Sequence, residues 1–174
     1  MARAWSGLLA NFAAGVFLLI LRPFRVGNFV TAGGVTGTVE IISLFGVTFN
    51  TPDNVLTIVG NAKILGDTIQ NYSANAYRRV ELLAQLDHTA DHARAIQILK
   101  AGMAQIPNVL PAPAPDCEIL TFTLAGPVLA VRPYCNNVNY WQVYFDTNRL
   151  IRESLGAAGF AVPEQHLAIQ TKAV

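Results

Sequence analysis

The stretch of sequence that decides the fold is Ala13-Ala-Gly-Val-Phe-Leu-Leu-Ile-Leu-Arg-Pro-Phe-Arg-Val-Gly-Asn-Phe-Val30. Its first part belongs to an uncharged apolar run over residues 8–21, which is typical of a helix in an apolar environment. The segment Arg22-Pro-Phe-Arg25 follows without a linker, and a β pattern punctuated by glycines then begins. The sequence therefore predicts a membrane-associated helix joined directly to a folded β domain.

The apolar run is short for a membrane-spanning helix. At about 1.5 Å per residue it reaches about 21 Å, whereas a bilayer core of about 30 Å needs about 20 residues. Ser6, Ala10 and Ala14 recur at spacings of four, which lets helix backbones approach each other closely. We therefore expect a helix packed among other helices. Two alternatives stay open: a signal peptide, with Arg3 as its charged region before the apolar stretch, and an ordinary core helix.

The composition is apolar for a soluble protein. The chain has 174 residues, of which 52% are hydrophobic and 13% charged, against about 25% charged in an average soluble domain. Part of its surface is therefore expected to be covered. The net charge of +1 provides no basic face of the kind that binds nucleic acid. Arg22 and Arg25 follow the helix, where the positive-inside rule places basic residues on the cytoplasmic side.

The chain after the helix divides into two patterns. Strands are expected at residues 28–31, 36–44, 47–50 and 55–59, which favours a small β barrel or sandwich. From residue 77 on, we expect a strand at 79–86 and then a helix at 90–105 that is capped by Asp87 or Thr89. A hairpin of 118–124 with 128–134 follows. A helix at 138–158 that ends at Gly159 and a strand at 165–170 complete the pattern. This βαββαβ order is that of a ferredoxin-like domain. The predicted domains are thus 1–24, 25–76 and 77–170 of an α+β protein.

The two cysteines, Cys117 and Cys135, are too few for a disulfide scaffold. They are symmetric about Gly126, so a hairpin without a bulge would place them on facing residues. In a reducing cytoplasm we expect free thiols.

No arrangement of residues predicts an enzyme, a cofactor or a metal site. The sequence contains no GxxxxGK[ST], GxGxxG or GxSxG motif, and its carboxylates form no evident acid and base pair. His88 and His92 have the i, i+4 spacing of two metal ligands, but the glutamate of the zinc-protease signature is absent. We interpret both histidines as surface residues.

The chain resembles the small-conductance mechanosensitive channel family, through motifs that succeed one another in the same order along most of its length. They are Gly7-Leu-Leu-Ala-Asn-Phe-Ala-Ala-Gly15, Arg22-Pro-Phe-Arg-Val-Gly27, Gly33-Gly34-Val-Thr-Gly-Thr-Val39, Thr48-Phe-Asn-Thr-Pro-Asp53, Asn61-Ala-Lys-Ile64, Asn71-Tyr-Ser73, Arg78-Arg79 and Val143-Tyr-Phe-Asp146. The first of these looks like the second half of the family's pore helix, the third transmembrane helix.

The resemblance implies a homoheptameric channel of the bacterial inner membrane that opens under membrane tension. Such a channel contacts membrane lipid, passes ions and small solutes during hypoosmotic stress, and needs no cofactor or nucleic acid. The resemblance also implies that the β domain is Sm-like and that the α/β domain lines a cytoplasmic vestibule. We expect the chain to be the C-terminal part of such a subunit, lacking the first two transmembrane helices and the first half of the pore helix. The first competing interpretation is a soluble, ring-forming, Sm-like RNA-binding or adaptor protein. The second is an enzyme built on the ferredoxin-like domain, such as an acylphosphatase-like hydrolase, which the fold alone cannot establish.

The resemblance also implies roles for single residues. By their place in the matched motifs, Gly7 and Gly15 are the helix hinges, and Asn11 is the residue that faces the β domain. Its contact there is the turn Asn61-Ala62-Lys63, in which Ala62 replaces the family's usual glycine, and Gly60 stands where the family usually has proline. Arg22, Pro23, Phe24 and Arg25 form the junction at the membrane interface.

Overall fold

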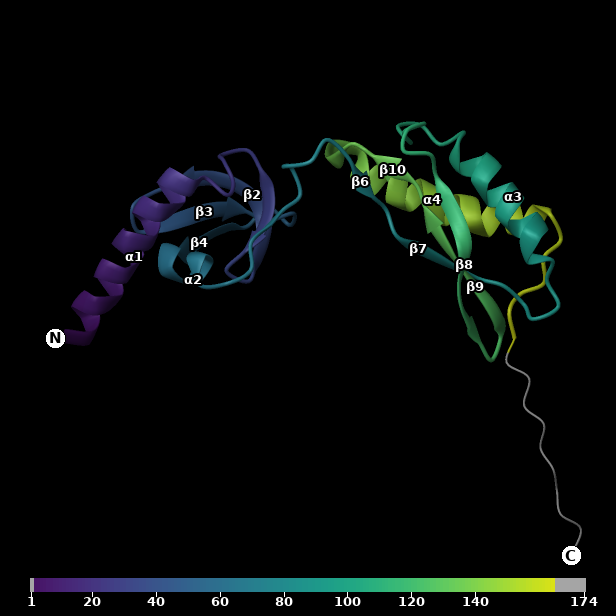
Figure 1. The fold of residues 1–174 in the computed structure, drawn as a ribbon, viewed down its shortest axis with the longest axis horizontal. Helices are drawn as coiled ribbons and strands as arrows, with labels where there is room; N and C mark the ends of the chain where they lie inside the picture. Colours follow the sequence, from purple (N-terminus) through teal and green to yellow (C-terminus); the bar gives the residue numbers. More distant parts are fainter. Residues whose placement is uncertain (1, 165–174) are drawn as a thin grey trace, which may run out of the picture. The chain divides into compact units, whose positions relative to one another are not determined.

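The computed structural model describes residues 2–164, and the chain divides into two compact units, Met1–Ala76 and Tyr77–Val174. Both units combine helices with β-sheet (Figure 1), so the expected mixture of the two is confirmed. Each unit has a hydrophobic core of its own. None of the helices within residues 2–164 combines the length and the apolarity that are needed to cross a membrane.

The amino-terminal unit is built on a five-stranded antiparallel sheet with the order β4-β3-β2-β1-β5. Its strands are β1 (Phe29–Ala32), β2 (Val35–Ile42), β3 (Gly46–Asn50), β4 (Leu56–Gly60) and β5 (Gln70–Asn71). The first four lie close to the ranges expected from the sequence. Gly33 and Gly34 make the turn between β1 and β2 with φ angles of 57° and 79°, a region that favours glycine.

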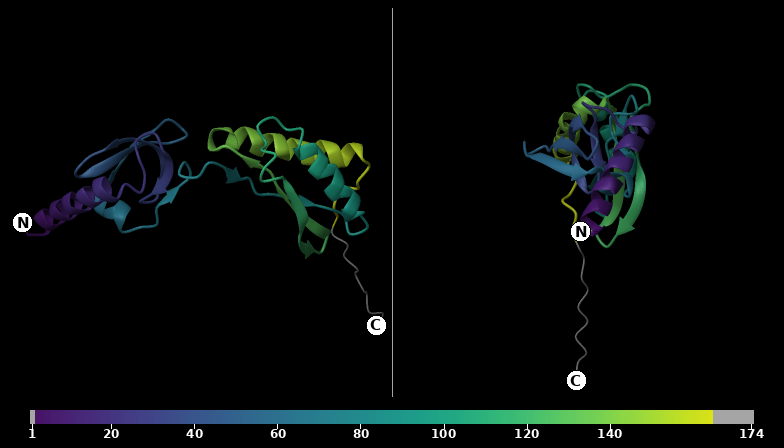
Figure 2. Two further views of the ribbon diagram at one scale, coloured as in Figure 1. Left: turned by 45° about the horizontal axis from the view of Figure 1, so that its top comes forward. Right: turned by 90° about the vertical axis from the view of Figure 1, so that its left-hand side faces the viewer.

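Helix α1 (Ala2–Leu21) is one uninterrupted helix that runs onto this sheet. Its amino-terminal turns extend beyond the sheet, as Figures 1 and 2 show. Between positions 5 and 21 of the helix, the buried residues are Ala14, Gly15 and Leu18. A second helix, α2 (Asn61–Leu65), follows β4 directly and was not expected from the sequence. Leu18 and Ile64 bring the two helices into one core, whose other buried members are Phe24, Val30, Ala32, Val39, Val47, Phe49 and Val59.

The carboxyl-terminal unit contains a three-stranded antiparallel sheet with the order β7-β9-β8 and a two-stranded pair of β6 and β10. The strands are β6 (Arg78–Arg79), β7 (Leu82–Gln85), β8 (Asp116–Thr123), β9 (Gly126–Arg132) and β10 (Tyr134–Cys135). The helices are α3 (His92–Met103), the 3-10 helix η1 (Asn137–Asn139) and α4 (Tyr140–Ala157). The strand expected at 165–170 lies outside the described residues.

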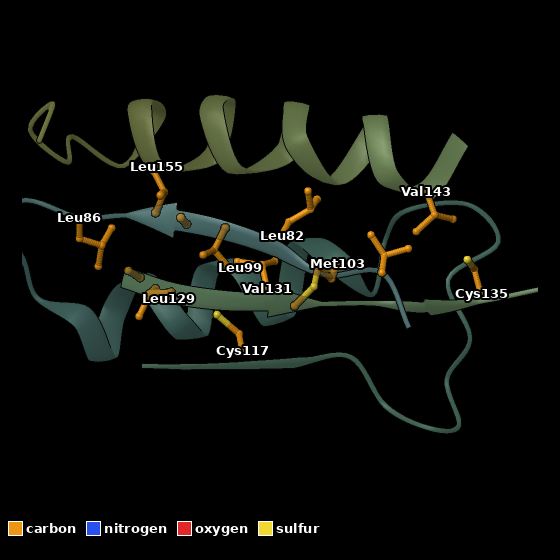
Figure 3. Packing of buried hydrophobic residues seen from close by; sticks show 13 residues of the cluster. Leu82, Leu86, Leu99, Met103, Cys117, Leu129, Val131, Cys135, Val143 and Leu155 are labelled. Atoms are coloured by element: carbon orange, nitrogen blue, oxygen red, sulfur yellow. The ribbon is translucent and has the colours of Figure 1, made fainter. Parts of the chain in front are cut away.

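Large apolar side chains fill the space between these helices and the sheet. Figure 3 shows Val143 and Leu155 pointing from α4 toward the strands, with Leu99 and Met103 of α3 in the same cluster. Leu99 and Met103 are fully buried. The helical periodicity that predicted α3 therefore reflects the packing of this helix into an apolar core.

Three details of this unit differ from expectation. The strand expected at 79–86 is divided into β6, which pairs with β10, and β7, which pairs with β9. The hairpin turns before Gly126, which pairs with Thr123, so Cys117 faces Val131, one residue further displaced by a bulge between Ile119 and Thr121. Cys135 lies in β10 and faces Arg78 in β6. The prediction that the two cysteines face each other was therefore wrong. The cap of α3 is Asp91, whose side chain accepts a hydrogen bond from Arg94 N.

Asp87 does not cap α3, because its carboxylate is engaged within a turn. Oδ1 of Asp87 accepts hydrogen bonds from both the backbone nitrogen and the hydroxyl of Thr89, at 2.9 and 2.6 Å. This turn lies before the helix begins at His92, so it explains why neither of the two caps expected from the sequence is used.

Candidate functional site

Helix α1 approaches the amino-terminal sheet most closely at Gly15. A Cβ atom added at this position would collide with the carbonyl oxygen of Leu44 and lie 2.5 Å from Nδ2 of Asn61. Leu44 belongs to the turn between β2 and β3. Because real Cβ atoms do not approach other atoms so closely, only glycine lets the helix lie against this turn. Gly15 therefore has a packing requirement in addition to any role in bending.

Asn11 caps the short helix α2 from outside. Gly60 precedes α2 and has no side chain that could satisfy the free N–H groups of the first turn. Oδ1 of Asn11 instead accepts a hydrogen bond from the backbone N–H of Ala62 at 2.9 Å. A Cβ atom on Gly60 would lie 2.8 Å from the same Oδ1. The absence of a side chain at Gly60 thus leaves room for the cap that Asn11 supplies.

Asn61 joins three segments at the same place. Its side chain is fully buried, and its Nδ2 donates to the carbonyl oxygens of Ser43 at 2.9 Å and Asn11 at 3.4 Å. Its backbone N–H donates to Phe45 O at 3.2 Å. Within the described part of the chain, Oδ1 of Asn61 is buried without a hydrogen-bond partner. Amide contacts thus connect α1, the β2–β3 turn and α2, and we call this contact region the α1 joint, formed by Asn11, Gly15, Leu44, Gly60, Asn61 and Ala62.

An apolar groove lies beside the α1 joint. The rings of Phe12 and Phe45 are 6.1 Å apart between centroids. They border a groove of about 380 Å³ that is also lined by Trp5, Ser6, Leu8 and Leu9. Trp5 is 71% exposed and Leu9 68% exposed. The amino-terminal turns of α1 therefore present an apolar surface beyond the joint.

The exit of α1 has a defined backbone structure. Arg22 ends the helix with a φ of 47°, its N–H donates to Leu18 O, and its Nε donates to Leu19 O at 3.1 Å. Phe24 turns back into the core and is only 2% exposed. A pocket of about 280 Å³ remains at this exit, lined by Leu18, Leu19, Arg22, Phe24, Arg25, Val26 and Ile42. Two arginines thus border a largely apolar hollow.

Asn71 of β5 holds the same exit from the side of the sheet. Its Nδ2 donates to Pro23 O at 3.0 Å and to Oδ1 of Asn28 at 3.1 Å. Its Oδ1 accepts from the backbone N–H of Ser73 at 3.0 Å. In the sequence, Asn71 was noted as part of a family motif. No local pattern predicts its contacts with Pro23 and Asn28, which lie more than forty positions away in the chain.

The structure brings some of the sequence-predicted residues together and leaves others apart. Asn11, Gly15, Asn61 and Ala62 meet in the α1 joint. Lys63 is exposed on α2, and Gly7 is exposed on α1 with nothing within 4 Å of an added Cβ atom. Arg22, Pro23, Phe24 and Arg25 form the helix exit. Sequence reasoning missed the backbone carbonyls of Ser43 and Leu44 and the role of Asn71.

The α1 joint contains no titratable side chain. Its polar contacts are made by the amides of Asn11 and Asn61 and by backbone groups. These groups do not ionise between about pH 4 and pH 10, so the joint itself is insensitive to pH. Among residues 2–164, no three His, Cys, Asp or Glu side chains are grouped as a metal site would require.

The joint lies within a region that matches a known family. The model of the mechanosensitive ion channel β-domain matches residues 7–74. The small-conductance mechanosensitive channel of Edwardsiella ictaluri is 34% identical over 160 residues, which cover 92% of this chain and 56% of that protein. The chain therefore carries a mechanosensitive channel domain of the MscS family. All residues of the α1 joint fall inside the matched β-domain.

Further relatives extend the comparison with the channel family. An uncharacterised MscS family protein of Buchnera aphidicola is 43% identical over 97 residues, which cover 56% of this chain and 34% of the relative. The closed-state structure of Helicobacter pylori MscS has a TM-score of 0.89 at 22% identity, and covers 99% of this chain and 69% of the MscS chain. The structural likeness is one of fold. The chain spans about half the length of the Edwardsiella channel and a third of the Buchnera protein.

Proposed function

We propose that this chain is a subunit of a homoheptameric, tension-gated channel of the bacterial inner membrane. The channel releases ions and small solutes during hypoosmotic stress, with most of this chain on the cytoplasmic side. The observation that carries this proposal is the match of the channel β-domain to residues 7–74, which include most of helix α1 and its joint with the sheet. The proposed role is that of a channel and not of an enzyme.

The arrangement of elements supports a finer description of both units. A helix followed by a five-stranded antiparallel sheet in the order β4-β3-β2-β1-β5 supports an Sm-like β domain. The succession β7, α3, β8, β9, α4 and the sheet order β7-β9-β8 support a ferredoxin-like domain that lines a vestibule.

Helix α1 is the proposed second half of a pore helix. Gly7 is its proposed hinge, because a helical glycine with open space around it costs up to about 1 kcal/mol relative to alanine and has no packing function. Gly15 is the second proposed bending point, constrained by its contact with Leu44. The hydrogen bond from the N–H of Ala62 to Oδ1 of Asn11 then couples a movement of helix α1 to the β domain.

The helix exit is the proposed contact with membrane lipid. Arg22 and Arg25 supply two positive charges beside the apolar hollow at Phe24. Basic residues next to an apolar surface suit the boundary between lipid headgroups and acyl chains. The soluble RNA-binding adaptor is not favoured, because the chain carries a net charge of only +1 and matches a channel family.

The assembly is tested by native mass spectrometry of the detergent-solubilised chain. We expect a heptamer whose mass is unchanged by RNase. A uniformly monomeric chain would contradict the proposed assembly, and a mass that falls on RNase treatment would favour the RNA-binding alternative.

The channel activity is tested with a chimera. Residues 7–164 replace the matching part of the Edwardsiella channel, and membrane patches are recorded under suction in cells without other mechanosensitive channels. We expect pressure-activated currents and survival of osmotic downshock. The matched control carries Lys63→Gln, an exposed position on α2 outside the joint contacts, and should behave like the unmodified chimera. Absence of currents from an assembled, membrane-inserted chimera would refute the proposed activity.

A further inference from the structure

Asn71 connects the end of helix α1 to the end of the amino-terminal unit. From strand β5 its Nδ2 reaches both Pro23 O and Asn28 Oδ1, while its Oδ1 accepts from Ser73 N. A single half-buried side chain therefore bonds to the helix exit, to the residue before β1, and to the segment after β5. No other contact in the amino-terminal unit described above joins these three segments through one residue.

Neighbouring hydrogen bonds complete the connection. Asn28 Oδ1 also accepts from the backbone N–H of Arg25 at 3.0 Å. Ser73 Oγ accepts from Phe29 N at 2.9 Å, and Tyr72 N donates to Phe29 O at 3.1 Å. Strand β5 has only two residues, so these side-chain bonds supplement a short backbone ladder. Residues 23–29 and 71–73 are thereby held to each other at several points.

This attachment differs from the α1 joint in what it holds. The joint fixes the middle of the helix to α2, whereas Asn71 fixes the helix exit to the strand from which the chain leaves the unit. We propose that Asn71 is a positioning residue that makes the exit of α1 and the segment at 71–73 move as one body. This inference rests on the proposed function only in taking α1 as the moving helix of a channel.

An isosteric pair of substitutions tests the proposal. Asn71→Asp keeps the acceptor for Ser73 N but replaces the donor with an oxygen that faces two other oxygens, those of Pro23 and Asn28. Asn28→Asp introduces the same charge a short distance away and keeps its Oδ1 acceptor for both Arg25 N and Asn71 Nδ2. The two variants therefore match in size and charge and differ in whether the Asn71 donor survives.

Hydrogen exchange of the full chain supplies the readout. In Asn71→Asp we expect backbone exchange over residues 23–29 to become about tenfold faster, as for the loss of part-buried hydrogen bonds. Exchange in β3 should stay unchanged, which a general loss of stability would not allow. Asn28→Asp should exchange like the unmodified chain over both segments.

Acidification provides a second readout that a purely steric effect would not give. A protonated carboxyl at position 71 can again donate a hydrogen bond, so the excess exchange of Asn71→Asp should shrink toward about pH 4, after correction for intrinsic rates. If Asn71→Asp does not fold, Asn71→Ala serves instead, with the same expected acceleration and no pH dependence.

Three results would overturn the inference. They are unchanged exchange over 23–29 in the Asn71 variants, equal acceleration in Asn28→Asp, and acceleration spread evenly over the whole amino-terminal unit. Each can be seen whether or not the chain assembles, because mass spectrometry of the unmodified chain tests assembly separately.

Discussion

Helices α1 and α3 are held to their sheets in opposite ways. Helix α3 inserts Ala95, Leu99 and Met103, all fully buried, into a core of large apolar side chains. The middle of helix α1 is held by the close approach of Gly15 to the backbone of Leu44 and by amide hydrogen bonds. Among the large side chains at positions 5–21 of α1, only that of Leu18 is buried. The comparison shows that α3 is fixed by apolar area, whereas α1 is fixed by shape and a few polar contacts.

The largest effect is expected in the apolar core of the carboxyl-terminal unit. Leu99→Ala should lower the free energy of unfolding of this unit by about 3 kcal/mol, because it removes buried methyl groups and leaves a cavity. Urea denaturation followed by Trp141 fluorescence measures this change. The control is Leu83→Ala on β7, where the side chain is 58% exposed and the expected loss is below about 1 kcal/mol. Equal losses would mean that α3 is not held by apolar burial.

A smaller effect of a different kind is expected at the α1 joint. Gly15→Ala should destabilise the docking of α1 by about 2 kcal/mol, because the new methyl group must push the helix away from Leu44. Gly7→Ala on the same helix is the control. Its Cβ meets no neighbour, so the substitution should stabilise the helix by up to about 1 kcal/mol. Circular dichroism melts of the two variants should therefore shift in opposite directions.

The polar half of the joint is tested at Asn11. Asn11→Leu leaves the N–H of Ala62 without its acceptor and should cost about 1.5 kcal/mol of docking stability. Asn11→Asp keeps the acceptor oxygen and should cost less. The exchange rate of the Ala62 amide distinguishes the two variants, and equal rates would show that the cap from Asn11 contributes nothing.

The smallest effect concerns a titratable group in the apolar core. Burial is the main cause that raises the pKa of Cys117 to about 11, from an ordinary value near 9. Because the pKa is higher in the folded state, the protonated thiol of Cys117 contributes to the free energy of unfolding. This contribution is fully present below pH 9 and is lost as pH rises toward 11. By pH 10 the loss should reach about 1 kcal/mol. Alkaline denaturation of Cys117→Ala should lack this part of the pH dependence, while the α1 joint, without titratable groups, should show none.

Local sequence patterns were sufficient to predict most of the fold. The strands of the amino-terminal sheet show β-branched residues between glycine and asparagine turns, and α3 and α4 show apolar residues at helical spacing. Helix α2 was missed because five residues are too few for periodicity to appear. The facing of the two cysteines was predicted wrongly because the hairpin turns before Gly126, which pairs with Thr123, and because Cys135 belongs to β10, which pairs with β6.

The candidate site could be predicted only in part for a related reason. Family motifs pointed to Asn11 and to Asn61-Ala62, and these residues meet in the structure. The partners that the motifs did not supply are mostly backbone carbonyls, such as those of Leu44 and Pro23, to which any residue type could contribute. Contacts with backbone carbonyls do not depend on residue type and cannot be predicted from the sequence. The contacts of Asn71 were therefore found only in the structure.

The cap on α2 has a consequence for the order in which this unit forms. A helix of five residues is too short to persist alone, because its nucleation is unfavourable. One of the hydrogen bonds that its first turn requires comes from Asn11, roughly fifty residues earlier in the chain. Helix α2 should therefore become fully ordered only after α1 has packed against the amino-terminal sheet. The amide resonance of Ala62 then reports directly whether α1 is packed there or detached.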